Sequence, residues 1–473
     1  MAIPEEILKI KPKNTRVKAT SREGEYDVIL RTSVWDKTKG KAVPKELGKI
    51  GVIKDGIYIP DNVSKEQKID SKEYGRFAFA DKLSRDLFLD LAKVYGVDDA
   101  KKIYVIAILR AINEDLKDEC IQVEYLTSFA SEAFPKVGLS SNTISTFLDK
   151  IGKATSQIDE FLLQRITKLN SKNSVIDGML KNNTSITNNM SEHSRKSRTK
   201  GSDDISLLYS YDLDLDEPIA YGVYPGNMLD HTAFDNFIDT YNIKNGFIIL
   251  DKGFDVNRIK EEMNKREIAY LLPIKQSRKE IDELSLNKDF SEAFVFENDT
   301  IRYKKTQSEN KYYYSFVSTD KSTSEERRYL DKKIKDGKFN KDKYLDKEDR
   351  FGLIVFESNK EMNAISIYKA YKKRWEIENF FRKYKNIIDR SEVNVQGIYR
   401  LYATEFINFI SSIIVMKIKK EIDDKGLNKK YSLPQIMSLL SKVRKRRCPR
   451  RKDKWEYEAS LVYIDDIVKT LGL

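Results

Sequence analysis

Three acidic residues, far apart in the sequence, have surroundings that suit metal-dependent chemistry. Asp177 follows the apolar run SVI, Asp251 follows the apolar run FIIL, and Glu378 stands among cationic and aromatic residues. Clustered carboxylates repel one another unless cations lie among them, and their oxygens suit Mg²⁺ or Mn²⁺. If the fold brings the three together, two such ions could activate a water or a 3′-hydroxyl for in-line attack on a phosphodiester.

Glu378 belongs to YKKRWEIENFFRKYK (371–385), which is expected to be a helix because it lacks Gly and Pro and repeats apolar residues every three or four positions. Four polar side chains fall within a wedge of about 60° on such a helix: Tyr371, Arg374, Glu378 and Lys385. A separate apolar stripe can pack on a core. Periodicity alone also fits a solvated charged face.

The cationic and aromatic residues of this helix suit contacts with nucleic acid. Arg374 can bind a phosphate through two hydrogen bonds, and Lys385 can act as a point charge. Tyr371 can donate a hydrogen bond to a phosphate oxygen. Trp375 can shield the site or stack on a base, and Arg382 is a further DNA-binding candidate.

Composition supports a polyanionic partner and excludes several kinds of site. The 473 residues include 86 Lys and Arg against 74 Asp and Glu, a net charge of +12. This excess suits nucleic acid first and an anionic membrane surface second. Two cysteines outside any CxxC pattern and only two histidines argue against a disulfide scaffold, a zinc site and a histidine-based triad. The N-terminus lacks an apolar signal segment, and the run 406–416 is expected to be a buried helix, so a cytoplasmic location is expected.

The elements that must position these residues predict a mixed α/β fold. The expected segments are a small β-meander at 1–62, a helical region at 63–172, the first part of a ribonuclease-H-like core at 173–275, a β-rich insertion with a solvated lysine-rich loop at 276–350, the second part of the core with the catalytic helix at 351–420, and a basic C-terminal segment at 421–473. The order β-β-β-α-β-α-β from residue 173 favours this core. Its first and fourth strands are neighbours, which would place Asp177 beside Asp251.

DNA-binding elements are expected on both sides of the core. A helix, the break PKVGLS and the helix 141–153, capped by Ser141 or Asn142, have the outline of a helix-turn-helix, although an ordinary helical hairpin fits as well. The run KVRKRRCPRRKDK (442–454) has nine Lys or Arg in 13 positions. Contact with the DNA backbone is favoured there over a solvated face, with three candidate residues: Arg444, Arg446 and Arg447.

The spacing Y-x2-R-x3-E-x6-K resembles the Y-R-E-K signature of one large group of bacterial insertion-sequence DDE transposases. Three further segments resemble the family's first-aspartate strand, the turn after it and the second-aspartate segment, in the same order: VIDG (175–178), YGVYPGNMLD (221–230) and ILDKGF (249–254). The resemblance is firm over 173–275 and 352–390.

The resemblance implies an enzyme that binds the terminal inverted repeats of an insertion sequence, cleaves the phosphodiester at each end and joins the 3′-hydroxyl to target DNA. It implies that Asp177, Asp251 and Glu378 bind two Mg²⁺ or Mn²⁺ ions, and that Tyr371, Arg374 and Lys385 hold the transposon end. The implied partner is double-stranded DNA, bound near the bacterial nucleoid by what could be a homodimer, with no membrane. Two alternatives stay open: a ribonuclease-H-like nuclease or resolvase that does not join, and an inactive DNA-binding remnant acting as a repressor.

Overall fold

The structure is a computed structural model. It describes every residue except 1–2, 37, 61–69, 114–115, 171–172, 184–189, 194–202, 229, 242–246, 250–255, 374–391, 394–396, 448–453 and 459–461. The chain divides into two compact units, Met1–Lys72 with Val443–Ser460 and Glu73–Lys442 with Leu461–Leu473.

The first unit contains a four-stranded antiparallel meander and most of a small basic sheet. The meander consists of α1 (Glu5–Ile10), β1 (Thr15–Ala19), β2 (Glu25–Asp36), β3 (Lys41–Lys54) and β4 (Ile57–Pro60), and each strand pairs with the next. Its buried centre is Val17, Val28 and Ile53. The small sheet has the order β18-β17-β5 and consists of β5 (Asp70–Glu73), β17 (Arg444–Arg447) and β18 (Trp455–Tyr457).

A helical region opens the second unit. It consists of α2 (Gly75–Ile112), α3 (Ile121–Thr127), α4 (Ala130–Ala133), α5 (Ser141–Lys153) and α6 (Thr155–Leu169). Gly96, with φ 72°, kinks α2 and divides it into two helical segments. Helices α3 and α4 are separate, and between them the backbone N–H of Phe129 donates to Glu73 O. The cap of α5 is Ser140, not Ser141 or Asn142, since its side chain accepts from the N–H of Thr143.

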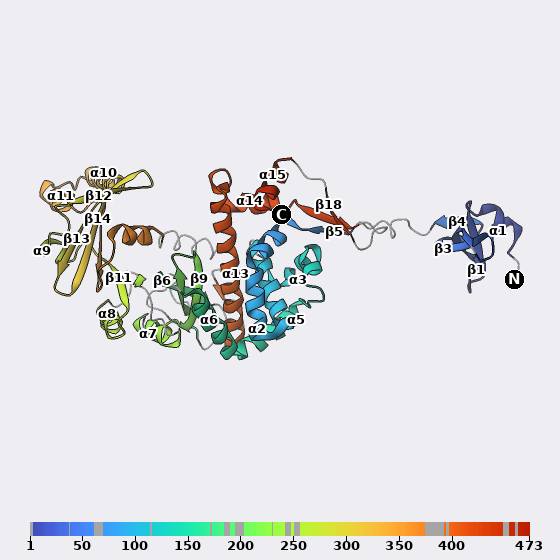
Figure 1. The fold of residues 1–473 in the computed structure, drawn as a ribbon, viewed down its shortest axis with the longest axis horizontal. Coiled ribbons are helices and arrows are strands. Elements are labelled where there is room, and N and C mark those ends of the chain that lie inside the picture. The colour runs from blue at the N-terminus through green and yellow to red at the C-terminus, as the bar shows by residue number, and fades with distance from the viewer. Residues whose placement is uncertain are drawn as a thin grey trace. The chain divides into compact units, whose positions relative to one another are not determined.

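Helix α13 (Ile398–Asp424) runs through the core of this unit. Figure 1 shows it beside α2, and it also contacts α5 and β9 (Glu217–Pro225). By length and composition it could cross a membrane, but 83% of its most apolar window is buried inside the protein. The buried helix predicted around 406–416 is therefore confirmed, and it is longer than the apolar run. Helices α14 (Leu433–Leu440) and α15 (Val462–Leu471) follow it.

The rest of the second unit is built on an eleven-stranded mixed sheet, as counted over the described residues. Its central part has the order β9-β8-β6-β10-β11, made of β6 (Asn173–Asn183), β8 (Asp203–Asp212), β9, β10 (Phe247–Ile249) and β11 (Ala269–Ile274). Strand β6 pairs parallel with β10 and antiparallel with β8, and β10 pairs parallel with β11. The first and fourth strands are thus neighbours, as predicted, and the mixed α/β order is consistent with a ribonuclease-H-like core. The short strands β7 (Glu192–His193) and β16 (Glu392–Val393) pair with β8 and β6, and the helices of this part are α7 (Asp230–Tyr241) and α8 (Val256–Lys265).

Beyond β11 the sheet continues through residues predicted to form an insertion. The elements are α9 (Glu280–Glu283), β12 (Glu292–Phe296), β13 (Asp299–Ser308), β14 (Lys311–Ser318), α10 (Thr319–Lys335), α11 (Lys341–Glu348) and β15 (Leu353–Ser358). Strand β15 lies between β14 and β11 and joins the two parts of the sheet. The solvated lysine-rich loop predicted before β15 is wrong, because these residues form the end of α10 and the whole of α11. Ser318 and Asn340 cap the two helices through the N–H groups of Lys321 and Lys343.

Candidate active site

Strand β6 carries the first predicted metal ligand, Asp177, in the middle of the sheet. The two residues before it, Val175 and Ile176, are buried (1% and 0% exposed). On the β8 side the partner of Asp177 is Tyr209, which is also buried. Asp177 therefore follows a buried apolar segment of β6, and its backbone is paired with β8.

Strand β10 approaches β6 in a register that bears on the second predicted ligand. Ile249, the last residue of β10, is paired in parallel with Val175. Asp177 stands two residues after Val175 in the sequence, and Asp251 stands two residues after Ile249. Asp251 itself lies outside the described residues. Asp177 and Asp251 thus each stand two residues after one member of the Val175–Ile249 pair, which lies side by side in the sheet.

The predicted catalytic helix is described only at its start. Residues 364–373 are helical, as the sequence predicts for 371–373. The ring of Tyr371 packs edge-on against Phe356 of β15, with centroids 5.0 Å apart. Two residues on, the Lys373 ammonium lies 3.2 Å from a carboxylate oxygen of Asp216, in the turn between β8 and β9. The start of this helix thus contacts β15 through Tyr371 and the turn between β8 and β9 through Lys373.

The remaining predicted residues of this helix lie outside the described residues: Arg374, Trp375, Glu378, Arg382 and Lys385. The geometry of the three acids is therefore not described. Among the residues that the structure does describe, no group of three His, Cys, Asp or Glu could hold a metal ion. The metal site stays a prediction from the sequence and from the register of β6 and β10.

A buried ion pair on the strand of Asp177 was not foreseen from the sequence. The ammonium of Lys181, four residues after Asp177 in β6, lies 2.6 Å from Oε2 of Glu405 in α13. The two side chains are 3% and 2% exposed. Because the partners are 224 residues apart in the sequence, no local pattern could have paired them. The pair joins the strand of Asp177 to the central helix.

The three arginines predicted to contact DNA differ in their surroundings on β17. Arg444 donates to the hydroxyl and the carbonyl oxygen of Ser71, both at 2.9 Å. Arg447 donates to Asp70 at 2.8 Å and lies over the ring of Trp455, 4.8 Å from its centroid. Arg446 is exposed, and no hydrogen bond or ion pair of its side chain is seen among the described residues. Of the three, Arg446 is the most accessible to a phosphate.

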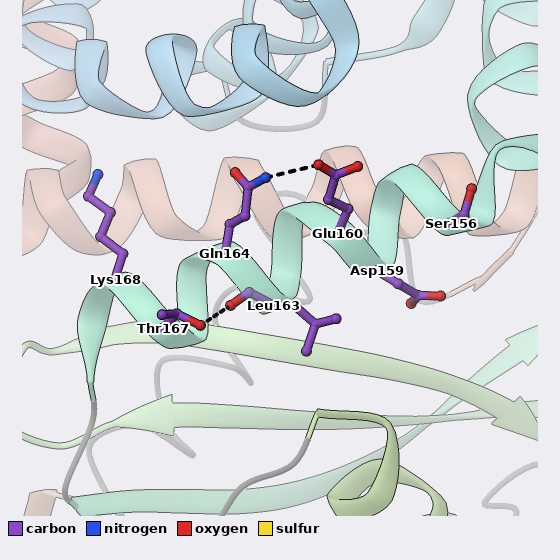
Figure 2. A pocket seen from close by; sticks show the side chains of 7 residues that line it. All are labelled: Ser156, Asp159, Glu160, Leu163, Gln164, Thr167 and Lys168. Atoms are coloured by element: carbon purple, nitrogen blue, oxygen red, sulfur yellow. Dashed lines mark hydrogen bonds between the residues drawn. The ribbon is translucent and has the colours of Figure 1, made fainter.

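A hollow of about 660 Å³ lies along α6 (Figure 2). The side chains that line it all come from α6: Ser156, Asp159, Glu160, Leu163, Gln164, Thr167 and Lys168. Helix α6 packs on β9, which is separated from β6 by β8. The hollow is therefore the outer face of a helix, two strands from Asp177, and it does not enlarge the candidate site.

Comparison with known proteins supports a DDE transposase. Residues 188–403 match the family model described as the transposase DDE domain, which is less than half of the chain. The match includes Asp251, Tyr371 and Glu378 and begins after Asp177. The chain is also similar to that in a cryo-EM structure of a piggyBac transposase synaptic complex with hairpin DNA, at 12% identity over 79% of this chain and 76% of that one. Its TM-score of 0.37 is too low to carry an argument. No curated protein matches the chain.

Proposed function

We propose that this chain is a metal-dependent DNA transposase of the Y-R-E-K group of bacterial insertion sequences. It binds terminal inverted repeats, cleaves the phosphodiester at the element ends and transfers the 3′-hydroxyl to target DNA. The observation that carries the proposal is the parallel pairing of Val175 with Ile249, because Asp177 and Asp251 each follow by two residues. The match of residues 188–403 to the transposase DDE domain supports the same class.

The proposed metal ligands are Asp177, Asp251 and Glu378. This donor set consists of carboxylates alone, in a chain with only two histidines, and fits Mg²⁺ or Mn²⁺ better than zinc. Two such ions, when bound, supply an activated nucleophile and stabilise the leaving oxygen.

The remaining helix residues bind the DNA in this proposal. Arg374 and Lys385 hold phosphates of the transposon end, Tyr371 orients one of them, and Trp375 and Arg382 contact the same strand. Because two ends must be joined, the complex with DNA is proposed to be a homodimer, working at the nucleoid in the cytoplasm.

The test is strand cleavage of a duplex carrying the element's end, with Mg²⁺ present. Asp251→Ala and Glu378→Ala should each abolish cleavage, whereas Asp331→Ala, an exposed acid of α10, should cleave as the wild type does. Full activity of either site variant would refute the mechanism. A second assay supplies a pre-cut 3′ end. Joined product supports a transposase, and cleavage without any joining would favour the ribonuclease-H-like nuclease instead.

A further inference from the structure

The hairpin of β2 and β3 extends beyond the meander as a two-stranded arm. Strand β1 pairs with β2 only as far as Leu30, and β4 pairs with β3 only from Gly51 onward. Residues 31–36 and 41–46, here called the arm, pair only with each other among the described strands. Six residues of strand extend for about 20 Å. A register shift between Leu30 and Arg31 marks the start of the arm.

The arm exposes apolar and basic side chains together. Trp35 is 63% exposed and Val34 is 47% exposed. Three lysines in the arm and its turn are also exposed: Lys39, Lys41 and Lys45. Because Val34 and Trp35 are consecutive in a strand, they point to opposite faces of the ribbon, so each face carries one of these apolar side chains.

The positive charge of the arm is only partly balanced. Residues 31–46, which are the arm and its turn, contain five Lys or Arg and two acidic residues. Glu46 is engaged by Lys18 and Arg16 of β1, at 2.8 and 3.2 Å, and these interactions lower the pKa of its carboxyl group. The hydroxyl of Thr38 donates to Asp36 and lowers the pKa of that carboxyl group. Both acids thus stay ionised with local partners, and Asp36 also lies 3.9 Å from the Lys39 ammonium. Lys41 and Lys45 have no ion pair among the described residues and are available to an anion.

Another protein strand is a poorer partner for the arm than DNA. Pro44 lacks the N–H that a ladder needs, so it obstructs strand addition along β3. The arms of two copies would bring like charges together. A polyanion such as DNA needs no N–H from Pro44, and its charge is opposite to that of the arm. A two-stranded β-ribbon fits the DNA major groove, which is about 12 Å wide, better than the minor groove, which is about 6 Å wide.

We propose that the arm inserts into the major groove of double-stranded DNA, with Lys39, Lys41 and Lys45 on phosphates and with Trp35 and Val34, on opposite faces of the ribbon, toward opposite walls of the groove. The inference rests on the proposed function for its partner, DNA, but not on metal chemistry. It assigns a DNA-binding site in the first unit in addition to the basic run at 442–454.

The experiment measures binding of the full chain to a fluorescent 30-base-pair duplex of mixed sequence, without metal, over a range of salt concentrations. The variant combines Lys39→Ala, Lys41→Ala and Lys45→Ala. Its matched control combines Lys9→Ala, Lys13→Ala and Lys54→Ala, which are exposed lysines of the same meander outside the arm. The arm variant should bind more weakly, and the slope of log K against log salt should fall by about 0.9 for each phosphate that the arm no longer neutralises.

Three results would overturn the proposal. If the arm variant binds as the control does, the arm is not a DNA site, although cleavage of element ends would still support the proposed function. If the wild-type chain binds no duplex at all, both proposals fail. If light scattering shows a wild-type dimer without DNA that Trp35→Ser and Val34→Ser together make monomeric, with DNA binding unchanged, the arm is an interface between copies.

Discussion

The ammonium group of Lys181 lies 2.6 Å from a carboxylate oxygen of Glu405, and both side chains are almost fully buried. Lys181 belongs to the strand of Asp177, and Glu405 belongs to the long helix α13 that packs on α2. A buried ion pair adds little net stability, but it is costly to break because one charge then remains unpaired. The pair therefore links the position of β6 to that of the helical region.

Glu405→Ala should destabilise the protein by about 3–5 kcal/mol, because it removes the carboxylate that lies 2.6 Å from the buried Lys181 ammonium. Asp423→Ala is the matched control on the same helix, since it removes the half-exposed Lys419–Asp423 pair and should cost less than about 1 kcal/mol. Urea unfolding of both variants measures the difference. Equal stability of the two variants would mean that the Lys181–Glu405 pair is not buried as described.

Gly152→Ala should separate α5 from α13. A Cβ at this position would lie 1.6 Å from the carbonyl oxygen of Tyr399, and backbone cannot yield as a flexible side chain does. A loss of about 1–3 kcal/mol or more is expected. Gly138→Ala, whose Cβ would lie 3.6 Å from Thr143 Cγ2, is the control and should change little. Thermal unfolding compares them, and an unchanged melting temperature for Gly152→Ala would contradict this crossing.

Stability should depend on pH through Asp159, on α6. Burial raises the pKa of the Asp159 carboxyl group, while a hydrogen bond with Tyr241 opposes the shift. The Tyr241 hydroxyl also lies 2.9 Å from the carbonyl oxygen of Tyr221 and can donate its one proton to that oxygen. A protonated Asp159 can then donate to the Tyr241 oxygen, so the carboxyl group, the hydroxyl and the carbonyl all have hydrogen-bond partners. The stabilising contribution is therefore complete below the unfolded-state pKa of about 3.9 and is lost as pH rises through the higher folded-state pKa.

Asp159→Asn removes this titration. Relative to the wild type, the variant should gain stability as pH rises from 3.5 to 7, which chemical unfolding across that range would show. Asp239→Asn is the opposite case, because the hydrogen bond from Arg266 lowers the pKa of Asp239. Its stability relative to the wild type should fall over the same interval. A constant difference between Asp159→Asn and wild type at every pH would contradict the role of Asp159.

We expect Arg444 of β17 to stabilise the fold and Arg446 of the same strand to bind DNA. Arg444→Ala removes two hydrogen bonds to Ser71 and should lower stability by about 1–3 kcal/mol. Arg446→Ala should leave stability within about 0.5 kcal/mol and weaken duplex binding, with a smaller salt slope. Unfolding and fluorescence anisotropy on the same two variants test this. Normal DNA binding by Arg446→Ala would remove it from the DNA-binding residues.

The central strands could be predicted because apolar runs bounded by turns, such as VIDG and FIILDKG, determine their own secondary structure. That β6 and β10 are neighbours followed from the usual strand order of such a sheet, whereas their register is seen only in the structure. The loop predicted before β15 is wrong because Ser318 and Asn340 cap two helices there, and a high density of lysines does not prevent a helix from forming.

Other features had no local signal at all. The partnership of Lys181 with Glu405 and the crossing at Gly152 arise from tertiary packing between distant segments. The arm of β2 and β3 could be predicted as strands, but its lack of neighbours depends on where β1 and β4 end. Asp251 and Glu378 remain predictions from sequence, supported by the register beside Asp177 and by the family match.

The central claim is that residues 177, 251 and 378 meet around divalent cations, and metal-directed cleavage tests it most directly. Fe²⁺ replaces Mg²⁺ in the full chain, ascorbate and peroxide then generate radicals at the bound ion, and mass spectrometry maps the backbone cuts. The account predicts cuts near all three residues, suppressed by excess Mg²⁺ and abolished in Asp251→Asn. Cuts confined to other segments, or unchanged by Mg²⁺ and by the substitution, would contradict it.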